Sequence, residues 1–338
     1  MSNNPTILVT GGTGYIGSHT VVSLIENGYE VVIIDNLSNS KKKVLERIEA
    51  ITGCKPKFYQ CDIRSIEKLD SIFSENKITA VIHFAALKSI TDSLKNPCQY
   101  FENNISGTLS LLESMKKHNI KNIIFSSSAS IYGDKNVSPI SEIGLVECKN
   151  SYAFSKYSAE MILKFESESD SKLSVSILRY FNPIGAHQSG LIGEDSKNPT
   201  NIMPHILTVA SKKYEIFKIY GKNYLTFDGT AVRDYIHVMD VANGHIAALK
   251  NNLSTHGLLL SNLGRGSGVS VLNLIRTFEI VNDIIIPFEF EDSREGDAGE
   301  IFANVEFANN KLGWVANKSL EDMCRDSWLW QCKNPNGY

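Results

Sequence analysis

The chain lacks closely spaced metal ligands and paired cysteines. Its six cysteines form no Cys-x-x-Cys pair, and its eight histidines form no His-x-x-x-His pair. Zinc sites and redox-active dithiols both need such ligands a few residues apart. We therefore expect no bound metal, and we expect the cysteines to remain reduced thiols.

Long apolar runs and a strong charge are also missing. No uninterrupted apolar stretch approaches the length needed to cross a bilayer, and residues 1–5 are too short and polar for a secretion signal. The formal net charge is only −3, which gives no electrostatic reason to bind nucleic acid or an anionic membrane. These features predict a cytoplasmic protein with neither kind of partner.

Apolar strand-like runs alternate with amphipathic segments through the first half of the chain. Strands are expected at 7–9, 30–35, 58–60, 80–84, 122–125 and 175–179, and helices at 18–27, 97–118 and 151–166. Such alternation is typical of an α/β fold with a Rossmann-type, doubly wound parallel sheet. The 338 residues suffice for two domains.

The alternation loosens after about residue 183, where Asn-Pro pairs and glycines mark loops. We expect residues 1–182 to form the sheet domain, with 232–262 returning to it. Residues 183–338 are expected to form a smaller mixed α/β domain.

A glycine-rich turn at 10–17 joins the first predicted strand to the first predicted helix. Gly11, Gly14 and Gly17 leave room for backbone N–H groups to approach a pyrophosphate at the positive end of the helix. Asp35 ends the second predicted strand, 18 residues after Gly17, where an acid typically binds the adenosine ribose. Because a carboxylate repels a 2′-phosphate, the pattern favours NAD over NADP.

Polar or glycine-rich segments follow the predicted strands of the first half. In an open parallel sheet the carboxyl ends of the strands line one crevice, and ligands bind there. Six such segments predict a large nucleotide ligand: 11–17, 35–40, 62–63, 84–88, 126–128 and 181–182.

Tyr152 and Lys156 form a Tyr-x-x-x-Lys pair on one face of a predicted helix. The lysine ammonium, together with a cationic nicotinamide ring, would lower the pKa of the phenol from its usual value of about 10. Tyr152 would then act as a general base near neutral pH. Ser128 ends a serine run at a strand terminus, where its hydroxyl can hydrogen-bond a sugar oxygen.

Six motifs resemble those of the UDP-glucose 4-epimerases (UDP-galactose 4-epimerases), a family of extended short-chain dehydrogenases/reductases. They lie at 10–19 (TGGTGYIGSH), 35–40 (DNLSNS), 83–88 (HFAALK), 125–133 (FSSSASIYG), 179–187 (RYFNPIGAH) and 232–240 (VRDYIHVMD). The similarity extends over nearly the whole chain. It implies an isomerase that holds NAD in its first domain and a UDP-sugar in its second.

The resemblance also implies two sets of contact residues. Besides the three turn glycines, NAD is expected to contact Tyr15, Ile16, Asp35, Asn36, Leu37, Ser38, Asn39, Ser40, Asp62, Ile63, Phe84, Ala85, Ala86, Leu87, Lys88, Asn103, Ser128, Tyr152, Lys156 and Phe181. The UDP-sugar is expected to contact Ser128, Tyr152, Asn182, Asn201, Arg233, Arg294, Asp297 and Ile301.

In the mechanism that the resemblance implies, Tyr152 takes the proton of the sugar 4-hydroxyl while the C4 hydride passes to NAD. The 4-keto sugar then turns over and takes the hydride back on its other face. Arg233 and Arg294 suit this reaction, because guanidinium groups can hold a diphosphate or ribose while the hexose rotates. The resemblance further implies a homodimer.

Three alternatives stay open. Ile301 falls at the wall beside the sugar 2-position, and its intermediate size leaves a UDP-N-acetylhexosamine 4-epimerase possible. A sugar-nucleotide dehydratase or decarboxylase is disfavoured, because dehydratases of this superfamily tend to place acids where Ala129 and Ser130 stand. A non-catalytic NAD-sensing regulator is disfavoured by the presence of both Tyr152 and Lys156.

Overall fold

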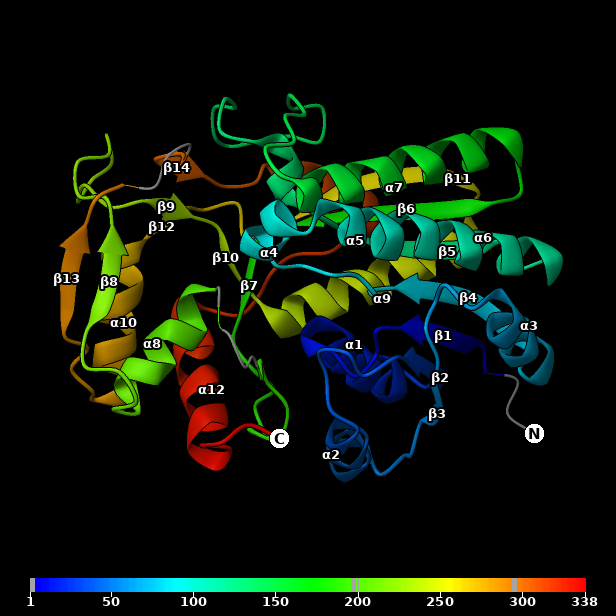
Figure 1. The fold of residues 1–338 in the computed structure, drawn as a ribbon, viewed down its shortest axis with the longest axis horizontal. Coiled ribbons are helices and arrows are strands. Elements are labelled where there is room, and N and C mark those ends of the chain that lie inside the picture. The colour runs from blue at the N-terminus through cyan, green and yellow to red at the C-terminus, as the bar shows by residue number, and fades with distance from the viewer. Residues whose placement is uncertain (1–3, 196–198, 200, 294–296) are drawn as a thin grey trace. The chain divides into compact units, whose positions relative to one another are not determined.

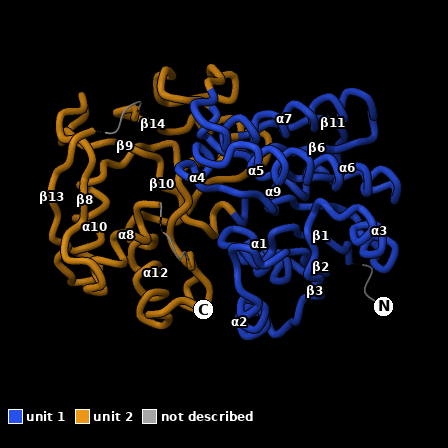
Figure 2. Tube along the Cα trace, viewed as in Figure 1, with its two compact units in different colours: residues 1–131, 148–179, 242–261 blue, residues 132–147, 180–241, 262–338 orange. Residues whose placement is uncertain are grey.

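The computed structural model describes residues 4–195, 199, 201–293 and 297–338. The chain forms two compact units (Figure 2): unit 1 comprises residues 1–131, 148–179 and 242–261, and unit 2 comprises 132–147, 180–241 and 262–338. The units differ from the expected domains at residues 132–147, at residues 180–182 and within the stretch 232–262. Residues 132–147 belong to unit 2, where Ile140 N–H donates to Phe302 O at 2.9 Å, and only 242–261 of the stretch 232–262 returns to unit 1.

Unit 1 is built on a seven-stranded sheet with the order β11-β6-β5-β4-β1-β2-β3 (Figure 1). The pairs β1–β2, β1–β4, β2–β3 and β4–β5 are parallel. Because β1 lies between β2 and β4, the chain must cross over in both directions. The predicted doubly wound sheet is confirmed, and its strands are β1 (Thr6–Thr10), β2 (Glu30–Asp35), β3 (Lys57–Gln60), β4 (Ile78–His83), β5 (Asn122–Ser128), β6 (Ser174–Tyr180) and β11 (Gly257–Leu263).

Both faces of this sheet are buried. Leu8 and Val81 belong to an apolar cluster with side chains of α3, α6 and α7, whereas their strand neighbours Ile7 and Ile82, which point to the opposite face, are also 0% exposed. The helices of unit 1 are α1 (Tyr15–Glu26), α2 (Lys43–Thr52), α3 (Ile66–Glu75), α4 (Ile90–Lys95), α5 (Pro97–Phe101), α6 (Gly107–Lys117), α7 (Ser151–Ser169) and most of α9 (Val238–Ser254).

The helix predicted over 97–118 is not continuous. A π-helical turn, η1 (Glu102–Ser106), separates α5 from α6. Within it, Asn104 is 3% exposed and bonds the backbone of Leu87. Such wide turns re-aim side chains and are frequent at functional sites. Hydrophobic spacing alone does not reveal a one-residue expansion of this kind.

In its described residues, unit 2 contains three small sheets in place of one large sheet: β10-β7, β12-β9-β14 and β13-β8. Its apolar core is formed mainly by α8, α10 and α12. The elements are β7 (Asn182–Ile184), α8 (Ile202–Ala210), β8 (Phe217–Tyr220), β9 (Val232–Arg233), β10 (Tyr235–His237), β12 (Val269–Ser270), α10 (Val271–Asn282), β13 (Phe288–Glu291), β14 (Glu300–Ile301), α11 (Glu306–Leu312) and α12 (Leu320–Lys333). A short 3₁₀ turn, η2 (Ala129–Tyr132), spans the change from unit 1 to unit 2.

Among the residues that the structure describes, none of the helices is both long enough and apolar enough to cross a membrane.

Candidate active site

The glycine turn between β1 and α1 is closed by backbone contacts that exclude side chains. Gly11 adopts a left-handed φ of 70°, and its N–H donates to Ile34 O at 2.7 Å. A Cβ at Gly17 would lie 2.2 Å from Gly11 O. The helix therefore begins close against the turn, and Gly14, at its N-cap, offers no side chain to cap the first N–H groups. Uncapped N–H groups at a helix start suit a phosphate.

Asp35 lies at the end of β2 and is 7% exposed. Its carboxylate accepts hydrogen bonds from Thr13 N–H at 3.2 Å, Leu37 N–H at 2.9 Å and Ser40 Oγ at 3.0 Å. The acid thus joins the glycine turn to the segment 36–40. Together with the side-chain-free turn, this arrangement fits a dinucleotide with its ribose beside Asp35.

Asp62 follows β3 and faces the same segment. Asn36 Nδ2 donates to Asp62 Oδ2 at 3.2 Å. Hydrogen bonds from the Arg64 guanidinium are the main cause that holds the pKa of Asp62 well below its usual range. Asp62 is therefore a permanent anion and hydrogen-bond acceptor at this edge of the sheet, and Ile63 beside it is buried.

The segment 84–88 follows β4, and backbone hydrogen bonds anchor it at both ends. Phe84 N–H donates to Thr10 O at 3.0 Å, and Leu87 N–H donates to Asn104 Oδ1 at 2.8 Å. Asn104 Nδ2 also donates to Ser155 Oγ at 2.9 Å, which links this segment to α7. The sequence interpretation chose Asn103 and missed Asn104; the only signal was an Asn-Asn pair in an amphipathic segment.

Tyr152 lies in the first turn of α7, and the structure brings it to Ser128 at the end of β5. The helix starts at this point because Asn150 Oδ1 caps it, accepting from Ala153 N–H at 2.8 Å. Burial raises the pKa of Tyr152, while a hydrogen bond with Ser128 and the charge of Lys88 act to lower it. In the chain alone, burial outweighs these two effects. The lowering of this pKa by Lys156 together with a bound nicotinamide ring stays a prediction.

Lys156 lies one turn further along α7 and is 3% exposed. Its ammonium donates to Ser126 O at 2.7 Å and lies 4.9 Å from the ring centre of Phe125. Burial lowers the pKa of Lys156 to about 7, and the charge of Glu160 opposes that shift. Lys156 can therefore gain or lose a proton near neutral pH.

Three residues expected to bind the sugar nucleotide come together in unit 2. The Arg233 guanidinium forms an ion pair with Asp297, and Ile301 on β14 pairs with Arg233 on β9 in parallel register. Arg233 Nη1 also donates to Val232 O at 2.8 Å. The cation is therefore held in one orientation next to Ile301.

Asp234, which the sequence interpretation did not select, organises this region. Its carboxylate accepts from Arg265 N–H at 2.7 Å and from Gly266 and Ala303 N–H at 3.1 Å each. Its backbone N–H donates to Ile301 O at 3.1 Å, and its C=O accepts from Asn182 N–H at 3.0 Å. Burial raises the pKa of Asp234 to about 6, against the opposing effect of the three N–H donors. Its sequence signal was an acid inside a strand-like segment that also carries Arg233 and His237.

Two further predicted residues of unit 2, Asn201 and Phe181, make other contacts among those described. Asn201 stands at the N-cap position of α8 without a side-chain capping bond, and its Nδ2 donates to Glu194 Oε1 at 2.8 Å. Phe181 is buried, with its ring centre 6.3 Å from that of Tyr132. Arg294 lies outside the described residues.

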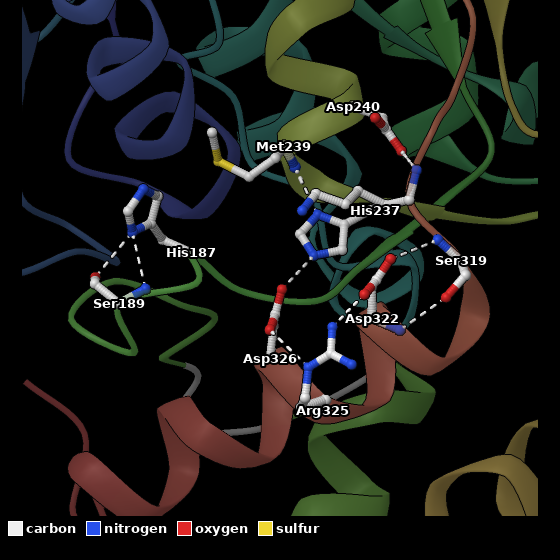
Figure 3. A network of polar contacts seen from close by, with 10 residues as sticks. His187, Ser189, His237, Met239, Asp240, Ser319, Asp322, Arg325 and Asp326 are labelled. Atoms are coloured by element: carbon white, nitrogen blue, oxygen red, sulfur yellow. Dashed lines mark hydrogen bonds and ion pairs between the residues drawn. The ribbon is translucent and has the colours of Figure 1, made fainter. Parts of the chain in front are cut away.

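A polar network joins the end of β10 to α12 (Figure 3). His237 Nδ1 accepts from Met239 N–H at 3.0 Å, so its Nε2 carries the proton and donates to Asp326 Oδ2 at 3.2 Å. Both side chains are buried. The pair locks the end of β10 in place, close in sequence to Arg233 and Asp234.

The comparisons agree with this geometry. Residues 7–259 match the model of the NAD dependent epimerase/dehydratase family. The chain belongs to this family. It is 49% identical to the UDP-glucose 4-epimerase of Bacillus subtilis over 98% of both chains.

Solved structures of the family extend the likeness to three dimensions. A UDP-glucose 4-epimerase from Stenotrophomonas maltophila with bound NAD and formylated UDP-arabinopyranose has a TM-score of 0.97 and 44% identity, covering 98% of this chain and 99% of that one. The enzyme from Bifidobacterium longum in complex with NAD+ and UDP has a TM-score of 0.94 and 44% identity, covering 98% and 100%. The predictions of the family and of NAD as its cofactor are confirmed. No cluster of His, Cys, Asp or Glu suited to a metal occurs in the described part of the chain.

Proposed function

We propose that the chain interconverts UDP-glucose and UDP-galactose by epimerisation at C4, using a tightly held NAD. The observation that carries this proposal is the group Ser128, Tyr152 and Lys156 on the same unit as the glycine turn and Asp35. The chemistry that bound NAD supplies is reversible acceptance of a hydride from C4. The high identity to epimerases over nearly the full length supports the same substrates.

Tyr152 acts as the base and later as the acid. Its hydroxyl is hydrogen-bonded to Ser128, which can share the proton with the sugar 4-hydroxyl. Since burial raises the pKa of Tyr152, the phenolate needs added positive charge, which the nicotinamide ring of NAD+ supplies when bound. Lys156, with a pKa of about 7, holds a proton beside this group.

Unit 2 holds the nucleotide while the hexose turns over. Arg233, oriented by Asp297, suits a diphosphate or ribose. Asn182 and Ile301 are joined to the same place through Asp234. If Arg233 holds the nucleotide and the hexose has few contacts, the 4-keto sugar can rotate and present its other face.

The experiment is to purify the chain, add no NAD, and follow UDP-galactose formation from UDP-glucose. The account expects turnover and release of about one NAD per chain on denaturation. Absence of both the dinucleotide and the activity would refute the proposed function.

One structural feature, the position of Ile301, bears on a second substrate class, the UDP-N-acetylhexosamines. Ile301 adjoins Arg233 through the β9–β14 pairing, so its side chain bears on what fits beside the sugar. Initial rates with UDP-galactose and UDP-N-acetylgalactosamine decide whether N-acetylhexosamines are also substrates. Ile301→Gly is the matched variant, because a smaller side chain should favour the N-acetylated substrate.

We further propose a homodimer formed through α6 and α7. Leu109, Phe154 and Phe165 on these two helices are 47%, 51% and 61% exposed, and a second copy would bury this apolar surface. Sedimentation of Phe165→Glu beside the unchanged chain tests this proposal, since the charge should yield monomers.

The six cysteines are free thiols in the structure, which suits the cytoplasmic location that we propose.

A further inference from the structure

A buried ion pair lies behind the catalytic group of unit 1. Arg179 on β6 donates from Nη2 to Glu160 Oε2 at 2.6 Å and from Nε to Oε1 at 3.0 Å. Both side chains are only 4% exposed. Two parallel charge-assisted hydrogen bonds fix the carboxylate in one orientation.

The pair is joined to the serine run at the end of β5. Ser127 Oγ donates to Glu160 Oε1. Its two neighbours in the chain serve the proposed reaction, because Ser126 O accepts from Lys156 Nζ at 2.7 Å and Ser128 bonds Tyr152. Glu160 thus holds the middle of the three serines.

Glu160 also lies one helical turn beyond Lys156 on the same face of α7. The charge of Glu160 raises the pKa of Lys156, whereas burial lowers it to about 7. Besides Tyr152, whose pKa burial raises, two titratable groups interact electrostatically with this region: His83 on β4 with Lys156, and Cys148 before α7 with Glu160 and Arg179. Burial lowers the pKa of His83 to about 3 and raises that of Cys148 to about 11, so both stay neutral near pH 7. Glu160 is then the anion that opposes deprotonation of Lys156.

We propose that Glu160 is a positioning residue for the epimerase reaction: clamped by Arg179, it keeps Lys156 in its ammonium form and holds the end of β5 in register with α7. The role in catalysis rests on the proposed function, whereas the effect on Lys156 does not. Glu160 itself touches neither sugar nor cofactor in this scheme.

The first measurement follows the protonation of Lys156 without using activity. The chain is labelled with ¹³Cε-lysine, the Lys156 signal is assigned from its absence in Lys156→Met, and the signal is titrated with NAD content held equal. In Glu160→Gln the titration should move to lower pH by about one to two units, the size expected for one charge about 6 Å away at an effective dielectric constant of 20 to 40. An unchanged titration midpoint would overturn the proposal.

The second measurement is the pH profile of turnover. If Lys156 must be an ammonium, activity falls as pH rises through its pKa, so Glu160→Gln should bring the alkaline decline to lower pH. The value of kcat at pH 8 should fall about tenfold while KM stays within about twofold, since each pKa unit is a factor of ten in the population. Equal losses at every pH would contradict the proposal and indicate a structural role alone.

Further variants separate charge from folding. Glu160→Gln leaves Arg179 buried without its anion, which is destabilising, whereas Glu160→Gln with Arg179→Met removes both charges. The titration midpoint of Lys156 should be highest in the unchanged chain, intermediate in the double variant and lowest in the single variant. Glu160→Asp keeps the negative charge, so the titration midpoint of Lys156 should stay close to that of the unchanged chain. Ser176 lies on the same strand as Arg179, and its Oγ donates a buried hydrogen bond of 2.6 Å to Asn252 Oδ1. Ser176→Ala removes this bond and should leave the titration midpoint of Lys156 unchanged. A wild-type chain with no epimerase activity would refute the function but leave the titration result standing.

Discussion

Units 1 and 2 are built by different kinds of interaction. In unit 1, a seven-stranded sheet places its loops mainly through backbone pairing and alternating apolar side chains. In unit 2, β9, β12 and β14 have two residues each, and buried side chains such as Asp234 bond the backbones of several loops. A sheet held by backbone hydrogen bonds tolerates many side-chain substitutions. Loops held together by one carboxylate do not tolerate its replacement.

The two units also divide the proposed work. Unit 1 carries the proton and hydride chemistry, and unit 2 carries the residues that hold the nucleotide. Changes in unit 1 should therefore act mainly on kcat or on NAD retention, and changes in unit 2 mainly on KM. The following variants would sharpen or break that division.

The largest effect is expected at Tyr152. Tyr152→Phe removes the base and should lower kcat about 10³-fold, within the range for loss of a general acid–base group. The KM for UDP-glucose and the bound NAD should change little. Tyr157→Phe on the same helix is the matched control, and a Tyr152→Phe chain with full activity would refute the assignment of the base.

Gly17→Ala should come next, through NAD retention. The new Cβ would lie 2.2 Å from Gly11 O, so the turn must open and the phosphate site is lost. We expect NAD in the purified chain to fall at least tenfold. Gly28→Ala, at the other end of α1 where nothing lies within 4 Å of the added Cβ, should strain the local backbone yet keep NAD.

Asp234→Asn tests unit 2. The amide cannot accept from all three N–H donors, so the free energy of unfolding should fall by about 3 kcal/mol. Because Arg233 and Ile301 lose their common anchor, KM should rise about tenfold with kcat nearly unchanged. Asp322→Asn, which weakens the capping box of α12 and the ion pair with Arg325, should leave KM alone. A loss of kcat in Asp234→Asn as large as that in Tyr152→Phe would contradict the division between units.

The smallest effect concerns pH and stability in unit 1. Burial lowers the pKa of His83 to about 3 from its usual 6.5. Below pH 6.5, His83 is therefore protonated in the unfolded chain but stays neutral in the folded chain. This contribution to stability is present above pH 6.5 and is lost as pH falls. Between pH 7 and 5 it should amount to about 2 kcal/mol. His83→Gln should reduce the pH dependence of denaturant unfolding by that amount; an undiminished dependence would count against it.

The difference between the units explains what the sequence could reveal. The doubly wound sheet and the glycine turn follow from periodicity and motif spacing, because each depends on local backbone geometry. The shared site of Ser128 and Tyr152, which lie on different elements, was implied only by the family resemblance. Asn104 and Asp234 escaped notice, since their roles depend on which distant loops their side chains reach. The raised pKa of Tyr152 likewise depends on burial, which spacing does not report.

The central claim is that one hydrogen leaves C4 and returns to the same carbon within one enzyme molecule. The direct test uses UDP-glucose deuterated at C4, converted in ordinary water without added NAD. The account predicts UDP-galactose that retains the deuterium at C4 in full. Loss of the label to solvent would show that C4 exchanges its hydrogen as a proton, and the account would be wrong.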